Sequence, residues 1–409
     1  MFTDLLWMSL VAVGAPLVVA LVPSLRIPAV VLEIVGGIII GPQVIGIATP
    51  DQHVRMMATI GLAFLLFLAG LEVDLDTFRS PVASLAARAF VLSMALAIAA
   101  GYLMNLAGTN EDPLLLAIIF VATSLGVVVP VLKDTGELES EFGQLVFIAG
   151  SMAEFGSIFL LSLFFSKDAK SPMSSLIMLI GFGLVIALSS FLVGRAWRGR
   201  WIARQMDRLE DTSSMLRVRA AIAVLFLFAV LANHLGLEAI LGTFVAGALI
   251  RVLDRGNGIM GTHLRGRLEA IGFGFVVAFF FVATGMRLDI KALFASWSSA
   301  KELVLFFGAL LFVRGVPAVI YRRRFGSRRS YVAGLMQATS LTFIVVAADL
   351  GRQLHKIDAP TQAALIAAGL LTVLLFPALA LLLSSPAERP AGPVQPMPAL
   401  AFERELDEG

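Results

Sequence analysis

The chain has 409 residues, of which 58% are hydrophobic and only 15% are charged. Soluble domains carry about 25% charged residues, so this composition indicates a protein that crosses a membrane many times. It has no cysteine, which excludes disulfides and thiolate chemistry. The net charge is only +2, and the basic surplus sits in short loops rather than in a nucleic-acid-binding patch. No catalytic triad, metal-ligand spacing or phosphate loop stands out, so we expect neither an enzyme nor a cofactor.

Apolar runs long enough to cross about 30 Å of hydrocarbon recur along the chain. The first has no basic stretch before it and no small-residue cleavage site after it, so we expect a retained helix rather than a signal peptide. About thirteen spans are predicted, which places the two termini on opposite sides of the membrane. The predicted spans are 5–23, 28–46, 54–73, 81–106, 113–132, 143–166, 173–195, 215–235, 237–253, 269–288, 299–321, 330–350 and 360–384.

Arginine clusters orient the predicted spans. One set of loops is rich in Arg, while the opposite set holds only scattered basic residues, and Arg-rich loops face the cytoplasm. We therefore predict a multi-pass protein of the cell (inner) membrane with an outer N-terminus and a cytoplasmic C-terminus. The Pro-rich, polar tail at 385–409 is predicted to be disordered. The cytoplasmic clusters are Arg195, Arg198, Arg200, Arg204, Arg208, then Arg251, Arg255, Arg265, Arg267, then Arg322, Arg323, Arg324, Arg328 and Arg329.

Two predicted spans are interrupted by polar residues near their middles. The spans at 113–132 and 330–350 both contain the tetrapeptide Ala-Thr-Ser-Leu, which supplies Thr123 and Ser124 to one and Thr339 and Ser340 to the other. Each is the fourth of five spans, and the two sets of five are offset by seven spans, so they enter the membrane from opposite sides. This pattern predicts inverted repeats with two broken helices that meet at the substrate site of a secondary transporter.

A plainer interpretation of these polar residues remains open. Ser and Thr in membrane helices often donate to the backbone carbonyl four residues earlier, and a Gly or Pro there is often a packing kink. For any single residue this interpretation is the stronger one. The matched placement in two spans, with a glutamate in the next helix, favours the functional interpretation.

Glu154 is a carboxylate in the middle of the predicted span 143–166. A charge at the bilayer centre costs about 2.5–3.5 kcal/mol on insertion scales, so a role must compensate for it. Ser151 and Ser157 lie on the same helix face at three-residue spacing. Arg314, about two turns inside the span 299–321, is the best-placed cation to compensate the carboxylate, although it could instead reach the membrane surface. A purely structural buried Glu154 is the other alternative.

A buried carboxylate that holds either a proton or a cation can couple two opposite flows, because the two ions compete for one site. The pattern therefore predicts a cation:proton antiporter with the transported cation bound at Glu154. The predicted ion- and proton-binding residues are Glu154, Ser151, Thr123 and Ser124, and the supporting residues are Arg314, Thr339, Ser340 and Ser157.

Several stretches, in order, resemble the monovalent cation:proton antiporter-2 family, which includes the Kef-type and NapA-type antiporters. The similarity runs from about residue 5 to residue 384. It implies thirteen spans, crossed broken helices in a six-helix transport domain, a dimerisation domain and elevator-type alternating access. The stretches are "EIVGGIIIGPQVIG" (33–46), "GLAFLLFLAGLEVDL" (61–75), "ATSLGVVVPVLKDTG" (122–136), "LEAILGTFVAGALI" (237–250) and "FFFVATGMRLDI" (279–290).

By this resemblance Glu154 occupies the ion-binding carboxylate position, and Arg314 the position of a basic residue that is commonly Lys. The family usually has Asp there, preceded by Asp, Asn or Gln, whereas here Ala153 precedes Glu154. With one titratable group, electroneutral one-for-one exchange is the simplest expectation. The tail is too short for a Kef-type nucleotide-binding domain.

The resemblance also implies an all-α membrane fold of the NhaA/NapA type that forms a homodimer in the lipid bilayer. A gated K⁺ efflux channel, a non-transporting sensor and a sodium-coupled organic-solute symporter remain alternatives. Outside the site, Arg287 is expected at the membrane interface and Glu72 in solvent. The expected organisation is a transmembrane domain at 1–384, with transport-core helices at 81–166 and 299–384 and scaffold helices at 5–73 and 173–288.

Overall fold

The computed structural model describes residues 2–21, 28–72, 80–106, 111–165, 180–181, 183–184, 215–235, 237–257, 264–288, 291 and 297–384. Within these ranges all regular structure is helical. Eight helical stretches are long and apolar enough to cross a membrane, and three shorter ones are apolar. The predicted span at 173–195, the Arg cluster at 195–208 and the tail at 385–409 fall outside the described residues, wholly or in large part, so the count of thirteen stays a prediction.

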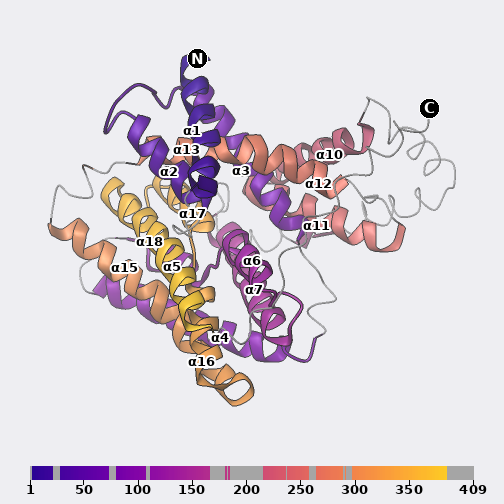
Figure 1. Ribbon diagram of the computed structural model, residues 1–409, viewed down its shortest axis with the longest axis vertical. Helices are drawn as coiled ribbons and strands as arrows, with labels where there is room; N and C mark the ends of the chain where they lie inside the picture. The colour runs from indigo at the N-terminus through magenta and orange to yellow at the C-terminus, as the bar shows by residue number, and fades with distance from the viewer. Residues whose placement is uncertain are drawn as a thin grey trace.

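One group of helices comes from the first and third quarters of the chain. Within it α11 packs along α3, α13 packs against both α2 and α3, and α10 lies on α11. Figure 1 shows α10, α11 and α12 together on the right of the molecule. The members are α1 (Phe2–Leu21), α2 (Ala29–Ile40), α3 (Gln52–Leu71), α10 (Leu216–His234), α11 (Ala239–Asn257), α12 (Leu264–Ile271), the π-helical turn η3 (Gly272–Val276) and α13 (Val277–Arg287).

The second group comes from residues 83–164 and 297–383. Here α4 packs on α5 and α7, while α18 packs on α15, α16 and α17 (Figure 1). The described helices of the two groups lie largely within the ranges predicted as scaffold and transport core, and the division into these two domains stays a prediction. The members are α4 (Ala83–Leu106), α5 (Pro113–Val121), α6 (Leu125–Asp134), α7 (Glu141–Phe164), α15 (Trp297–Gly315), the 3₁₀ helix η4 (Val316–Tyr321), α16 (Arg322–Ala338), α17 (Thr342–Gln353) and α18 (Ala359–Leu383).

Two glycines let α3 and α11 approach closely. A Cβ atom on Gly70 would lie 2.0 Å from the carbonyl oxygen of Phe244, and one on Gly247 would lie 2.0 Å from that of Phe67. These distances are far below van der Waals contact, so both positions require glycine. Small residues at such contacts are how membrane helices pack without a hydrophobic driving force between them.

Gly247→Val is therefore expected to separate α3 from α11 and to lower the melting temperature of the detergent-purified protein. Overpacking of this kind costs about 1–3 kcal/mol or more. Size-exclusion chromatography after heating measures the effect. Gly14→Val on α1 is the control, since a Cβ there meets no atom within 4 Å. Equal melting temperatures for the two variants would contradict the close contact.

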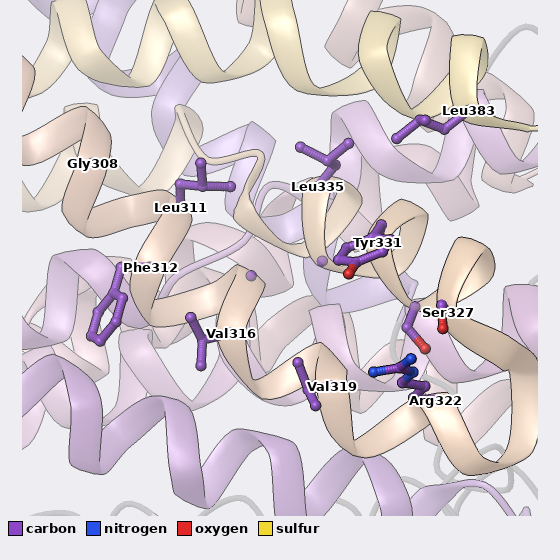
Figure 2. A pocket seen from close by; sticks show the side chains of 13 residues that line it. Gly308, Leu311, Phe312, Val316, Val319, Arg322, Ser327, Tyr331, Leu335 and Leu383 are labelled. Carbon is purple, nitrogen blue, oxygen red and sulfur yellow. The ribbon is translucent and has the colours of Figure 1, made fainter.

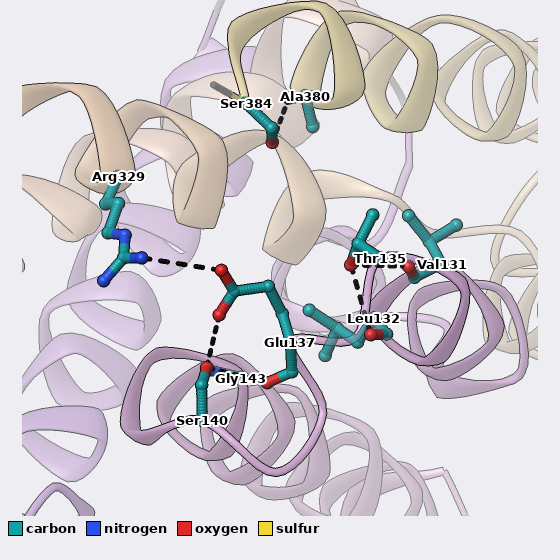
Figure 3. Close-up of polar contacts among 9 residues, drawn as sticks. All are labelled: Val131, Leu132, Thr135, Glu137, Ser140, Gly143, Arg329, Ala380 and Ser384. Carbon is teal, nitrogen blue, oxygen red and sulfur yellow. Dashed lines mark hydrogen bonds and ion pairs between the residues drawn. The ribbon is translucent and has the colours of Figure 1, made fainter. Parts of the chain in front are cut away.

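The loop between α6 and α7 is tied to α16, as Figure 3 shows. Ser140 is the N-cap of α7, where its hydroxyl accepts a hydrogen bond from the Gly143 N–H at 3.0 Å and contacts the Glu137 carboxylate. Glu137 pairs with Arg329 of α16 at 3.5 Å. The Thr135 hydroxyl lies 2.9 Å from the carbonyl oxygen of Val131 in the last turn of α6. The loop is thus fixed against the second group of helices.

Candidate functional site

Both Ala-Thr-Ser-Leu stretches interrupt helices, as the sequence predicted. The backbone leaves the helical conformation at residues 122–124, between α5 and α6, and at residues 339–341, between α16 and α17. Thr123, Ser124, Thr339 and Ser340 have no solvent-exposed surface. Each break leaves backbone N–H and C=O groups without helical partners, and inside a membrane these groups need partners from the protein.

The two breaks supply one another's missing partners. The Ser124 N–H donates to the Thr339 carbonyl oxygen at 2.9 Å. The Ser124 hydroxyl oxygen accepts hydrogen bonds from the N–H groups of Leu341 at 2.8 Å and Thr342 at 3.0 Å, at the start of α17. These bonds confirm that the two interruptions meet. They also show that the Ser124 hydroxyl organises the second break.

Glu154 lies on α7 beside the first break, and its side chain is 4% exposed. Its carboxylate accepts a hydrogen bond from the Leu125 N–H at 3.1 Å. Leu125 is the first residue of α6, where the helix dipole presents partial positive charge. The break between α5 and α6 therefore explains how a carboxylate is accommodated in the middle of the predicted membrane span. A carboxylate accepts several hydrogen bonds or ligands, so capacity remains for a proton or a cation.

Ser151 lies one turn before Glu154 on α7, and its role as a ligand stays a prediction. It is 2% exposed, and its hydroxyl oxygen has no hydrogen-bond partner among the described residues. A buried polar atom left in that state calls for an ion or a water. The Ser340 hydroxyl oxygen likewise finds no hydrogen-bond partner in the described ranges. Ser157 differs, because its hydroxyl donates to the Ile118 carbonyl oxygen at 3.3 Å and so ties α7 to α5.

Arg314 is fully buried on α15, which rules out the alternative that it reaches the membrane surface. The expected direct pairing with Glu154 is wrong. The guanidinium instead donates to the Thr123 hydroxyl at 3.1 Å, the Ser93 hydroxyl at 3.1 Å and the Ala149 carbonyl oxygen at 3.2 Å. A planar fork of five N–H donors can join several acceptors at once, and here it joins α4, α7 and the first break. Within the described residues, the guanidinium is thus bonded to Thr123, Ser93 and Ala149 and not to Glu154.

Thr123 is likewise occupied by structural bonds. Its hydroxyl donates to the Gln337 carbonyl oxygen at 2.6 Å while accepting from Arg314. The Gln337 side chain in turn exchanges hydrogen bonds with the Tyr321 hydroxyl at 3.2–3.3 Å. Ser93, Gln337 and Tyr321 were not predicted as site residues. Gln337 was visible as an amide within an apolar span, but nothing marked Ser93 in its Ala-rich helix.

Two charged residues that the sequence placed in solvent or at the interface have partners. Arg287, at the end of α13, pairs with Asp349 of α17 at 3.0 Å, and Gln362 donates to the same carboxylate at 2.6 Å. Glu72, at the end of α3, is half-buried and lies 3.8 Å from Arg265. The expectation that Glu72 is simply solvated is therefore corrected, whereas Arg287 stays exposed at the end of its helix and gains a partner there. Asp349 ties the two groups of helices together.

An all-helical membrane protein with two broken helices that meet beside a buried carboxylate has the architecture of a secondary transporter. A family model described as "Sodium/hydrogen exchanger, transmembrane" matches residues 9–381. The chain belongs to this family.

Individual relatives and one solved structure agree with this assignment. YjbQ of Bacillus subtilis (strain 168) is 29% identical over 87% of this chain and 58% of its own length. Cation/H(+) antiporter 18 of Arabidopsis thaliana is 24% identical over 90% of this chain and 47% of its own. The chain thus spans about half of these relatives. The sodium proton antiporter MjNhaP1 of Methanocaldococcus jannaschii, solved at pH 8, matches with a TM-score of 0.60 over 93% of this chain and 98% of its own, at 16% identity, a likeness of fold.

Proposed function

We propose that the chain is a secondary-active antiporter that exchanges protons for a monovalent cation, Na⁺ or K⁺, with Glu154 as the shared site. The observation that carries the proposal is the place of Glu154. Its carboxylate is buried where the two broken helices meet, and one turn away lies the Ser151 hydroxyl, which has no hydrogen-bond partner in the part of the chain that the structure describes. Membership of the cation:proton antiporter-2 branch within the family is part of this proposal.

Coupling follows from the cost of burying charge. A bare carboxylate in a dry site is unfavourable, and either a proton or a cation relieves it. Because both ions need the same oxygens, binding of one releases the other. The Ser151 hydroxyl would be a second oxygen ligand for the cation. Thr123 and Ser124, predicted as ligands, hold the geometry of the breaks instead, since their hydroxyls are engaged with Arg314, Gln337 and the start of α17.

Alternating access would come from movement of the group that contains α7 and both breaks against the group that contains α3 and α13. The ranges 81–166 and 299–384 would form the moving transport core, and 5–73 and 173–288 the scaffold. We propose a homodimer in the inner membrane, with an outer N-terminus. Helices pack extensively within each group and only sparsely between the two groups, which supports this division.

The test of the proposal is a proteoliposome assay with an internal pH-sensitive dye. After a proton gradient is imposed, adding Na⁺, K⁺ or Li⁺ outside is expected to dissipate it for at least one of these cations, and choline is expected to have no effect. The panel also gives the selectivity, which depends on cavity size and ligand count. A gradient indifferent to every cation in the panel would overturn the proposal.

Exchange is expected to be electroneutral. Ala153 supplies no second carboxylate beside Glu154, and Arg314 stays protonated because guanidinium does not titrate in proteins. One proton then replaces one cation. The measurement uses Na⁺ as the transported ion while potassium and valinomycin clamp the membrane potential. If the imposed membrane potential shifts the equilibrium proton gradient at a fixed Na⁺ gradient, net charge crosses the membrane in each cycle. The exchange would then be electrogenic, and the prediction would be wrong.

A further inference from the structure

A groove of about 540 Å³ runs between the two arms of the hairpin that α15 and η4 form with α16, and Glu154 is not among its lining residues. The chain reverses at Gly326, whose φ of +79° places it in the left-handed region. Leu311, Phe312, Val316 and Val319 line the groove, and the end of α18 closes it (Figure 2). From Gly308 to the turn it extends roughly 20 Å along the helix.

The groove changes character along its length. Figure 2 shows apolar side chains at the Gly308 end, whereas Arg322, Ser327 and Tyr331 gather at the end near the turn. Val319 is 59% exposed and Phe312 is 50% exposed, so the apolar part is open to the hydrocarbon of a bilayer. One end of the groove is apolar and exposed, and the other carries a cation and hydroxyl groups. This distribution is complementary to a molecule with an apolar tail and an anionic head.

The cation at that end is uncommitted. Among its neighbours in the hairpin, Arg324 pairs with Glu141, Arg329 pairs with Glu137, and Arg328 donates to the Leu383 carbonyl oxygen. Arg322 has no hydrogen bond or ion pair within the described part of the chain. The arginines of the turn therefore hold the hairpin in place, and Arg322 alone lines the groove with its charge free.

We propose that this groove binds one anionic glycerophospholipid, with an acyl chain along α15 and η4 and its phosphate at Arg322 and Ser327. The occupant must be apolar over most of its length and anionic at one end. A span that ends in several arginines sets that end at the level of the lipid head groups, where basic pockets between membrane helices bind anionic lipids. A zwitterionic lipid fits the apolar length equally but adds a cation beside Arg322.

The experiment is native mass spectrometry of the full chain in mild detergent. The protein is equilibrated with equal amounts of phosphatidylglycerol and phosphatidylcholine of identical acyl chains. One phosphatidylglycerol is expected to be retained per chain in preference to phosphatidylcholine. Arg322→Gln is expected to lower that preference about fivefold, because one juxtamembrane cation contributes about that much. Gly308→Trp, where a Cβ meets no atom within 4 Å, is expected to reduce retention of both lipids by filling the groove.

Arg323→Gln is the matched control. Arg323 is exposed, belongs to the same arginine run and does not line the groove, so its replacement is expected to leave the preference unchanged. Equal retention of the two lipids by the wild type, or equal losses in Arg322→Gln and Arg323→Gln, would overturn the proposal. Displacement of phosphatidylglycerol by millimolar inorganic phosphate would also overturn it, since the site would then recognise an anion without its acyl chain.

Discussion

Glu154→Gln is expected to fold, reach the membrane and lose cation-dependent proton movement to the level of empty vesicles. The amide oxygen of Gln can still accept the hydrogen bond from the Leu125 N–H, so the start of α6 keeps its partner. The amide does not gain or lose a proton at physiological pH, and it has no charge with which to attract a cation. The proposed coupling thus fails at its only shared site while the surrounding packing is preserved. The proteoliposome assay measures the loss, and size-exclusion chromatography checks the fold.

Glu33→Gln is the matched control for this change. Glu33 is another buried glutamate, 7% exposed, but it lies on α2 in the other group of helices. Removing its charge is expected to leave exchange close to that of the wild type. If Glu154→Gln exchanges at the wild-type rate, the carboxylate is structural and the central proposal is wrong. If Glu33→Gln is equally inactive, loss of any buried carboxylate disturbs the protein and the assignment of Glu154 has no support.

The sequence was enough to find the centre of the site. Polar residues at mid-span marked both breaks, because Thr123 and Ser124 in one span match Thr339 and Ser340 in the other, although Thr339 alone also makes the ordinary bond to the carbonyl of Leu335, four residues earlier. Glu154 stood out as a carboxylate in the middle of a predicted span. Apolar runs of spanning length also located the described membrane helices. These features are local, so a single sequence carries them.

The meeting of the two breaks was predictable from their matched placement, but the individual side-chain partners across distant segments were not. Arg314 and Glu154 were the obvious pair by charge, yet Arg314 bonds to Ser93 and Thr123, because the direction of a side chain on its helix decides its partners. Arg287 ends an apolar span, as interfacial residues do, and only the folded arrangement of α13 and α17 brings it to Asp349. The hydrophobic pattern locates the membrane spans, but it does not determine which helices pack against one another or which side chains meet.

The ion pair between Arg287 and Asp349 is expected to break in every transport cycle. It joins α13 of one group of helices to α17 of the other, and the proposed elevator motion slides these groups past one another. The two side chains are 33% and 24% exposed, and bridges at this exposure contribute about 0.2–1 kcal/mol. The pair is therefore strong enough to favour the described conformation and weak enough to separate.

Locking these two positions together should stop exchange. The chain has no cysteine, so Arg287→Cys with Asp349→Cys gives a protein with only these two thiols. A short, reducible bifunctional thiol reagent is expected to abolish exchange in the cross-linked fraction, and dithiothreitol is expected to restore it. Glu137→Cys with Arg329→Cys is the control, because that pair, 3.5 Å apart, lies within one group and should tolerate the same cross-link. Full exchange by the cross-linked 287–349 protein would mean that α13 and α17 keep their places during transport. The elevator motion would then be excluded, even if Glu154 remained the exchanging site.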